Sequence, residues 1–162
     1  LVLFSQYPVI AQFEGYPTLM FRAANVRQNV ISEATAKLRL LRFERTPEGS
    51  AMRRIYDLPL LRSEQPVFQL GWQLMHRIDE NSLLHGLSAE ALGRTQTEFI
   101  LTLFGTDETT GQGLRSRHIW PASAVRWQHR YVDLLSVDAD GVSHMDYTHF
   151  HGVQPEPGDL AP

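Results

Sequence analysis

Cysteine is absent from this sequence of 162 residues, and so are long apolar runs and long blocks of one charge. Without cysteine the chain has no disulfide and no thiolate metal site, which fits a reducing, cytosolic compartment. The longest apolar pieces, such as residues 99–104, fall well short of the ~18 residues that a membrane-spanning helix needs. The 15 basic and 18 acidic side chains are interspersed, so no patch typical of nucleic-acid binding is present.

An initiator methionine and a basic leader are also missing at the N-terminus, where the chain starts Leu1-Val2-Leu3-Phe4. We therefore expect that further chain precedes it in the natural protein. Apolar residues make up 43% of the sequence and charged residues 20%, which is a globular composition, and the length suits one domain. We expect this piece to be soluble and to fold as a single unit.

Strands are predicted along the first half of the chain by alternation of apolar and polar side chains. The alternation is clearest over residues 33–40, where alanine and leucine occupy the even positions and polar side chains the odd ones. Residues 9–13 and 18–24 predict two shorter strands before it. Residues 67–78, with apolar side chains at every second position, predict one long strand after it.

A short helix and several turns complete the pattern. Ser88 is placed to cap a helix over residues 89–92, which Gly93 would end. Residues 98–104 and 114–120 predict strands on either side of a polar, glycine-bearing loop, and Asp140-Gly141 favours a hairpin. The sequence predicts an all-β, immunoglobulin-like β-sandwich with one short helix. Residues 1–153 would form this domain, followed by a flexible C-terminal tail at 154–162.

Motifs for catalysis are lacking, and we do not expect an enzyme. No Gly-x-Ser-x-Gly elbow is present, and Gly111-Gln112-Gly113 is not followed by the Lys-Ser/Thr of a phosphate loop. The adjacent acids Asp79 and Glu80 are interpreted as part of a turn rather than as an acid/base pair. The histidines at 144, 149 and 151 lie close together in the sequence, and on a strand His149 and His151 would share a face with spacing that a metal could use. Solvated or hydrogen-bonded side chains are nevertheless the favoured interpretation, and no metal site is predicted.

A collinear set of segments resembles the cytoplasmic domain of prokaryotic inward-rectifier potassium channels. The resemblance extends from about residue 4 to 153 and rests on residues 17–27 (PTLMFRAANVR), 76–82 (HRIDENS), 108–111 (ETTG), 127–131 (WQHRY) and 146–150 (DYTHF). The sequence departs from the family pattern at Leu83, Phe104 and residues 118–120. The collinear order of the segments makes the resemblance specific.

The resemblance implies a homotetramer whose sandwiches surround an aqueous vestibule that continues the pore of their own transmembrane domain. This would place the chain at the cytoplasmic face of the bacterial inner membrane. No cofactor is implied; K⁺ would be the permeant ion, and Mg²⁺ or polyamines would be pore blockers. Glu33 and Glu108 match the acids that line the vestibule. The gating loop would consist of Glu108, Thr109, Thr110, Gly111, Gln112 and Gly113.

Contact with anionic lipid is a further implication of the resemblance, through Arg27. The neighbouring position, where many relatives have lysine, is Gln28. The alternative to a channel domain is a free-standing immunoglobulin-like module that binds a protein partner through exposed loops. Nucleic acid is not an expected partner.

Overall fold

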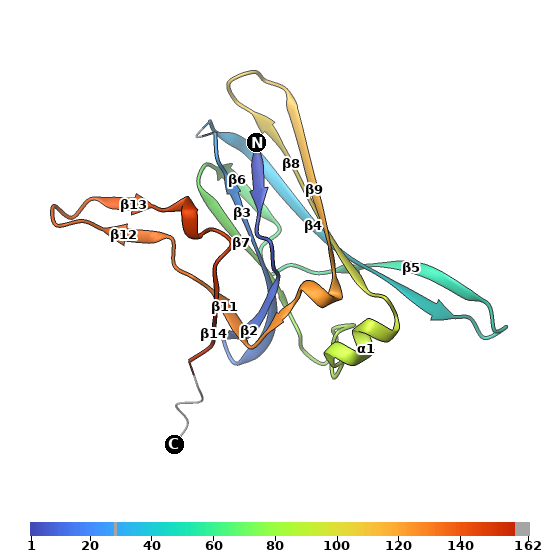
Figure 1. Ribbon diagram of the computed structural model, residues 1–162. Helices are drawn as coiled ribbons and strands as arrows, with labels where there is room; N and C mark the ends of the chain where they lie inside the picture. Colours follow the sequence, from blue (N-terminus) through green and yellow to red (C-terminus); the bar gives the residue numbers. More distant parts are fainter. Residues whose placement is uncertain (28, 158–162) are drawn as a thin grey trace.

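Alternating side chains build two β-sheets that pack face to face in the computed structural model, which describes residues 1–27 and 29–157 (Figure 1). The first sheet has five strands: β1 (Val2–Phe4), β2 (Val9–Phe13), β3 (Tyr16–Asn25), β7 (Gly71–Arg77) and β10 (Arg126–Trp127). β3 lies at its centre, between β7 on one side and β1 and β2 on the other. All pairings are antiparallel except that of β2 with β10.

The second sheet is built around the longest strand of the molecule. It also has five strands: β4 (Ile31–Arg45), β5 (Ala51–Leu58), β6 (Glu64–Phe68), β8 (Glu98–Asp107) and β9 (Gly113–Pro121). β6 pairs with the first part of β4 and β5 with the second part, along the same edge. β8 covers the other edge of β4, and β9 covers β8.

The core lies between these sheets and follows the alternation of β4. Ala34, Ala36, Leu38 and Leu40 are each at most 2% exposed, as the alternation predicts. Aromatic side chains from both sheets, including Trp120, fill the space around them. The all-β sandwich with one short helix is therefore confirmed.

Two short antiparallel pairs of strands extend the sandwich at the C-terminal end of the chain. β11 (His129–Tyr131) pairs with β14 (Val153–Pro155), and β12 (Leu135–Val137) pairs with β13 (Ser143–Met145). Gln154 and Pro155, at the start of the tail predicted over residues 154–162, thus lie in a strand. Residues 158–162 lie outside the described residues.

The predicted strand over residues 67–78 is wrong, because the chain changes sheets there. β6 ends at Phe68 in the second sheet and β7 starts at Gly71 in the first. Phe68 is 1% and Trp72 5% exposed, but Leu70, between the two strands, is 49% exposed. In a sandwich both sheets bury a face in the same core, so a chain can change sheets without changing which positions are apolar.

Three helical segments connect strands: α1 (Ala89–Arg94) and the 3₁₀ turns Ala122–Ala124 and Tyr147–His149. α1 begins as predicted, because the Ser88 hydroxyl accepts a hydrogen bond from the amide of Ala91 at 3.2 Å. It continues past Gly93, however, and Thr95 is its C-cap. None of the helices in the described part of the chain is long and apolar enough to cross a membrane.

Candidate functional site: an acidic end of the second sheet

Glu33 lies near the start of β4, in a β-bulge. The register with β8 shifts between Ser32 and Thr35, and Glu33 has a φ of 50°, in the left-handed region that non-glycine residues seldom adopt. A bulge turns the side chain away from the direction that simple alternation sets. Glu33 is exposed as predicted, but its direction is set by this bulge and not by the alternation of β4.

Gly105 on β8 packs against the bulged part of β4. A Cβ atom at this position would lie 2.5 Å from Cγ2 of Ile31 and 3.4 Å from the carbonyl oxygen of Ser32. Only glycine permits the two strands to come this close without a shift of the Ile31 side chain. Gly105 therefore allows the bulged segment that carries Glu33 to pack tightly on β8.

The predicted gating loop is the connection between β8 and β9. β8 extends to Asp107, so the loop itself covers residues 108–112, and Gly113 pairs with Thr106 as the first residue of β9. Every residue from Glu108 to Gly113 is exposed. Gly111 has a φ of 71°, and its amide donates to the carbonyl oxygen of Asp107 at 2.7 Å.

The fold brings Glu108 to the same end of the sheet as Glu33, although 75 residues separate them in the sequence. The amide of Glu108 donates a hydrogen bond to the carbonyl oxygen of Val30 at 3.0 Å, three residues before Glu33. The pairing of Ile31 with Asp107 continues this contact into the two strands. Both of the predicted vestibule acids are thus exposed on one end of one sheet.

Asp107 is a third acid at this end, and sequence reasoning overlooked it. Hydrogen bonds from Asn29 and then from the amide of Thr109 hold the pKa of Asp107 below its usual value. Asp107 is therefore ionised at neutral pH. The signal that could have found it is the Asp107-Glu108-Thr109 order, which is typical of an aspartate that accepts from the amide two residues later.

Arg27 lies in the segment that crosses from β3 to β4, and its position is exposed. Its amide donates to Oδ1 of Asn25 at 3.4 Å, and the buried Asn25 amide group donates in turn to the Phe68 carbonyl oxygen at 3.2 Å. Gln28, the other residue of interest in this segment, lies outside the described residues. The fold thus places Arg27 at the end of the sandwich where β4 begins.

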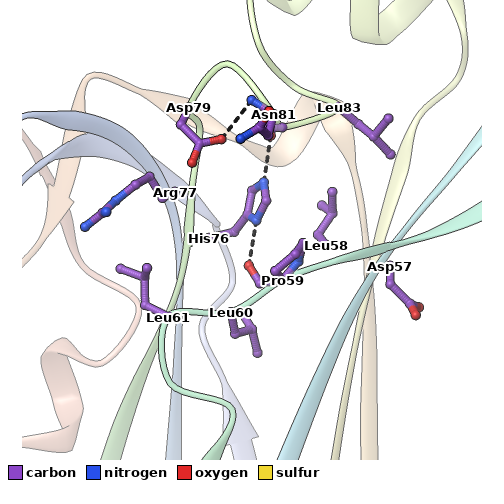
Figure 2. Close-up of a pocket in the computed structure, with 11 residues that line it drawn as sticks. Asp57, Leu58, Pro59, Leu60, Leu61, His76, Arg77, Asp79, Asn81 and Leu83 are labelled. Carbon is purple, nitrogen blue, oxygen red and sulfur yellow. Dashed lines mark hydrogen bonds between the residues drawn. The ribbon is translucent and has the colours of Figure 1, made fainter.

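A cavity of about 250 Å³ between β5 and the loop after β7 is the other polar feature of interest (Figure 2). His76 crosses it: Nδ1 donates to the Pro59 carbonyl oxygen and Nε2 accepts from the Ser82 hydroxyl, both at 2.7 Å. Burial lowers the pKa of His76. Asp79 accepts from the amide of Asn81 at 3.0 Å, the turn contact that was predicted. This arrangement joins two loops, and the Ser82 hydroxyl also accepts a hydrogen bond from the amide of Leu84 at 3.1 Å.

The three histidines considered as metal ligands have separate partners. His144 pairs with Asp138 at 2.7 Å, His149 lies 3.5 Å from Asp146, and Nδ1 of His151 accepts from the Gln6 amide at 2.9 Å. In residues 1–27 and 29–157 no group of three or more His, Asp or Glu side chains is arranged to hold a metal ion.

Comparison with known proteins shows which family this chain resembles. A family described as "Inward rectifier potassium channel C-terminal domain" matches residues 2–157. The inward rectifier potassium channel Kirbac3.1 of Paramagnetospirillum magnetotacticum is 40% identical over 152 residues, which cover 94% of this chain and 52% of the relative.

Animal channels are more distant relatives. The human G protein-activated inward rectifier potassium channel 1 is 32% identical over 162 residues, covering 94% of this chain and 31% of the relative. The mouse ATP-sensitive inward rectifier potassium channel 8 is 30% identical over 153 residues, covering 92% of this chain and 36% of the relative. The chain thus spans about half the length of the bacterial relative and about a third of the animal ones. These relatives are ion channels and not enzymes, and the match favours a channel domain over a free-standing binding module.

Proposed function

Because the chain belongs to the inward rectifier potassium channel family and matches its C-terminal domain, we propose that it forms the cytoplasmic vestibule of a tetrameric potassium channel. In this proposal four copies surround a water-filled path for K⁺ that continues the channel's own transmembrane pore. The channel would lie in the bacterial inner membrane, with this domain on the cytoplasmic side.

The observation that supports the proposal most directly is the convergence of Glu33 and Glu108 on one end of the second sheet. Repeated four times around an axis, each glutamate becomes a ring of four charges. Such rings raise the local concentration of cations and attract multivalent ions most strongly. Mg²⁺ and polyamines would therefore enter this path from the cytoplasm and block outward flow more readily than inward flow.

The size of the effect follows from Coulomb's law. Two unit charges about 10 Å apart in water interact by roughly 0.4 kcal/mol, so a ring of four attracts a divalent ion by roughly 3 kcal/mol before screening. A Debye length of about 8 Å reduces this to about 1 kcal/mol. One ring then changes the affinity for a divalent blocker about fivefold.

The loop at residues 108–113 would form the cytoplasmic constriction. Its residues are exposed and Gly111 has a positive φ, so the backbone at the tip adopts a shape that side-chain-bearing residues disfavour. Four such tips at the axis could approach one another and separate. Arg27, on the same end of the molecule, would contact anionic lipid headgroups.

Block by Mg²⁺ or a polyamine in the full-length channel tests the proposal. We expect Glu33→Gln and Glu108→Gln each to weaken block about fivefold, because each removes one ring of charge. Glu48→Gln is the matched control: Glu48 is equally exposed but lies in the turn between β4 and β5, and block should not change. Unchanged block in the Glu33→Gln, Glu108→Gln double variant would refute the proposal.

A further inference from the structure

Two arginines on the outer face of β9 lie opposite uncharged side chains. β9 is the edge strand of the second sheet, next to β8. Arg115 and Arg117 are exposed, whereas Trp120, at an even position, is buried, so both arginines lie on the face that points away from the core. The register places Arg115 opposite Phe104 and Arg117 opposite Thr102. Charged side chains on a sheet often pair with an opposite charge across the strands, and these neighbours do not permit that.

Lys37 adds a third positive charge to the same face. It lies on β4 opposite Thr102, so Thr102 has Lys37 on one side and Arg117 on the other. Thr102 is 2% exposed although it lies on the outer face, which indicates that the longer side chains around it close over it. By strand geometry the Cα atoms of Lys37 and Arg117 are roughly 10 Å apart, and those of Arg115 and Arg117 roughly 7 Å. Three cations therefore lie close together on one small part of the sheet.

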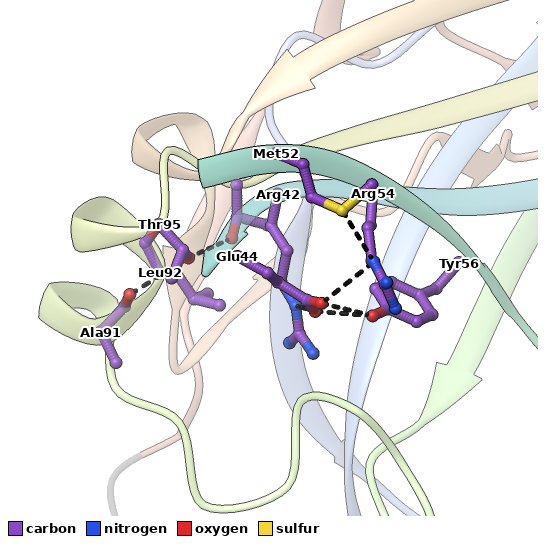
Figure 3. A network of polar contacts seen from close by, with 9 residues as sticks. Arg42, Glu44, Met52, Arg54, Tyr56, Ala91, Leu92 and Thr95 are labelled. Carbon is purple, nitrogen blue, oxygen red and sulfur yellow. Dashed lines mark hydrogen bonds and ion pairs between the residues drawn. The ribbon is translucent and has the colours of Figure 1, made fainter. Parts of the chain in front are cut away.

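Most other arginines of the second sheet are paired with an acid of the same chain. These pairs are Arg39 with Asp57, Arg42 and Arg54 with Glu44, and Arg53 with Glu98. Figure 3 shows one of them, in which the Glu44 carboxylate accepts a hydrogen bond from Arg42 at 2.8 Å. In residues 1–27 and 29–157, by contrast, no carboxylate oxygen lies within 4.0 Å of a charged nitrogen of Lys37, Arg115 or Arg117. An ion pair within the described part of the chain therefore does not neutralise these three side chains.

A nearby acid offsets part of the charge at Lys37. Glu64 and Asp57 line the same hollow of about 450 Å³ as Lys37. Asp57 is already ion-paired, which leaves Glu64 as the acid beside Lys37. Glu64 lies on β6, which is separated from β9 by β4 and β8, a distance of roughly 14 Å. We therefore expect Arg115 and Arg117 to contribute more of the positive potential than Lys37.

The guanidinium of Arg115 is oriented by the side chain opposite it. Its Cζ atom lies 5.4 Å from the centroid of the Phe104 ring, over the ring face, and Phe104 is half-buried. Stacking on an aromatic face fixes the plane of a guanidinium group. The N–H donors lie in that plane, so the ring does not cover them, and two of them match two oxygens of a phosphate group. The fold thus supplies part of the ordering that binding of an anion requires.

We propose that Arg115, Arg117 and Lys37 form a binding site for a soluble anion that carries two or more phosphate groups. Electrostatic attraction increases with the charge of the ligand, so a polyvalent phosphate binds more tightly here than chloride or a single carboxylate. Arginine is also the side chain whose geometry suits phosphate oxygens best. A bound polyphosphate offsets the mutual repulsion of the three cations. The site lies within one chain, so it does not depend on the proposed tetramer.

Isothermal titration calorimetry of the full-length channel with inorganic tripolyphosphate tests the site. The channel is held in nanodiscs of phosphatidylcholine, so that no anionic lipid competes. An exposed ion pair changes an affinity by up to about fivefold, so Arg115→Gln and Arg117→Gln should each weaken binding about fivefold. Lys37→Gln should weaken it only about twofold, because Glu64 offsets part of its charge. The Arg115→Gln, Arg117→Gln double variant should weaken it by more than about tenfold.

Arg94→Gln is the matched control. Arg94 is exposed in the last turn of α1, and its replacement removes the same charge without a change to β9. The affinity of this variant for tripolyphosphate should match that of the wild type. Every position replaced is exposed, so all variants should unfold in urea near the wild-type midpoint. Equal losses of affinity in Arg94→Gln and Arg117→Gln would show that only the net charge matters and would overturn the site.

Two other results would also overturn the proposal. If the wild-type channel binds no tripolyphosphate, the three cations are solvated or contact an acid of another copy. If nanodiscs that contain phosphatidylglycerol abolish the binding, a lipid headgroup and not a soluble anion occupies the site. We expect similar affinities for tripolyphosphate in the two kinds of nanodisc.

Discussion

Replacement of Gly105 by alanine should destabilise the domain by crowding the bulge beside Glu33. The added methyl group would lie 2.5 Å from Cγ2 of Ile31, far inside ordinary van der Waals contact. Ile31 is 2% exposed and β-branched, so its methyl group has little room to move. Relief of the clash requires either an unfavourable rotamer of Ile31 or a separation of β4 from β8.

The expected cost is about 1–3 kcal/mol, the usual range when an extra methylene is forced into a well-packed core. Gly113→Ala is the matched control, because no atom lies within 4 Å of the position that its Cβ would take. Its effect should remain within about 0.5 kcal/mol. The two glycines belong to the same pair of strands, so the comparison isolates the close contact.

Urea unfolding of the domain followed by circular dichroism measures these differences. Ile31→Ala removes the Cγ2 methyl group, so Gly105→Ala should cost less in that background than in the wild type. We expect the coupling between the two sites to be about 0.5–3 kcal/mol. Equal stability of Gly105→Ala and Gly113→Ala would refute the reasoning, and so would additive effects of Gly105→Ala and Ile31→Ala.

Two further predictions concern buried polar groups. Burial lowers the pKa of His76, so this side chain binds a proton more readily in the unfolded state than in the folded state. The free energy of unfolding should therefore decrease as the pH falls through about 6.5. His76→Gln should flatten this decrease, whereas His85→Gln, at an exposed histidine, should not. The Tyr131 hydroxyl lies 2.7 Å from the Tyr7 carbonyl oxygen and 3.0 Å from that of Met20. Tyr131→Phe should therefore lower the free energy of unfolding measured in urea by about 1–3 kcal/mol. Tyr16→Phe, at a residue that is 40% exposed, should have little effect. Equal losses in the two variants would contradict the prediction.

Patterns within a few neighbouring residues predicted two kinds of element: strands whose burial alternates with a simple period, and helices whose capping residue is close in sequence. The alternation over residues 33–40 identified the buried face of β4, and Ser88 identified the start of α1. Both depend on the geometry of one strand or one helical turn. The break between β6 and β7 escaped prediction because Phe68, Leu70 and Trp72 continue the apolar period through it, although Leu70 is exposed.

The sequence by itself determined the sandwich, the family and the exposure of Glu33 and Glu108. The signals for them are the apolar period, the turn residues and the collinear motifs, and each of these depends only on the order of residues along the chain. Only the tertiary structure decided that these two acids share one end of a sheet, because pairing of β4 with β8 joins segments remote in sequence. It alone also decided the bulge at Glu33, which depends on the close packing of β4 against Gly105. The electrostatic roles of both acids stay predictions, since a ring of charge depends on how the copies assemble.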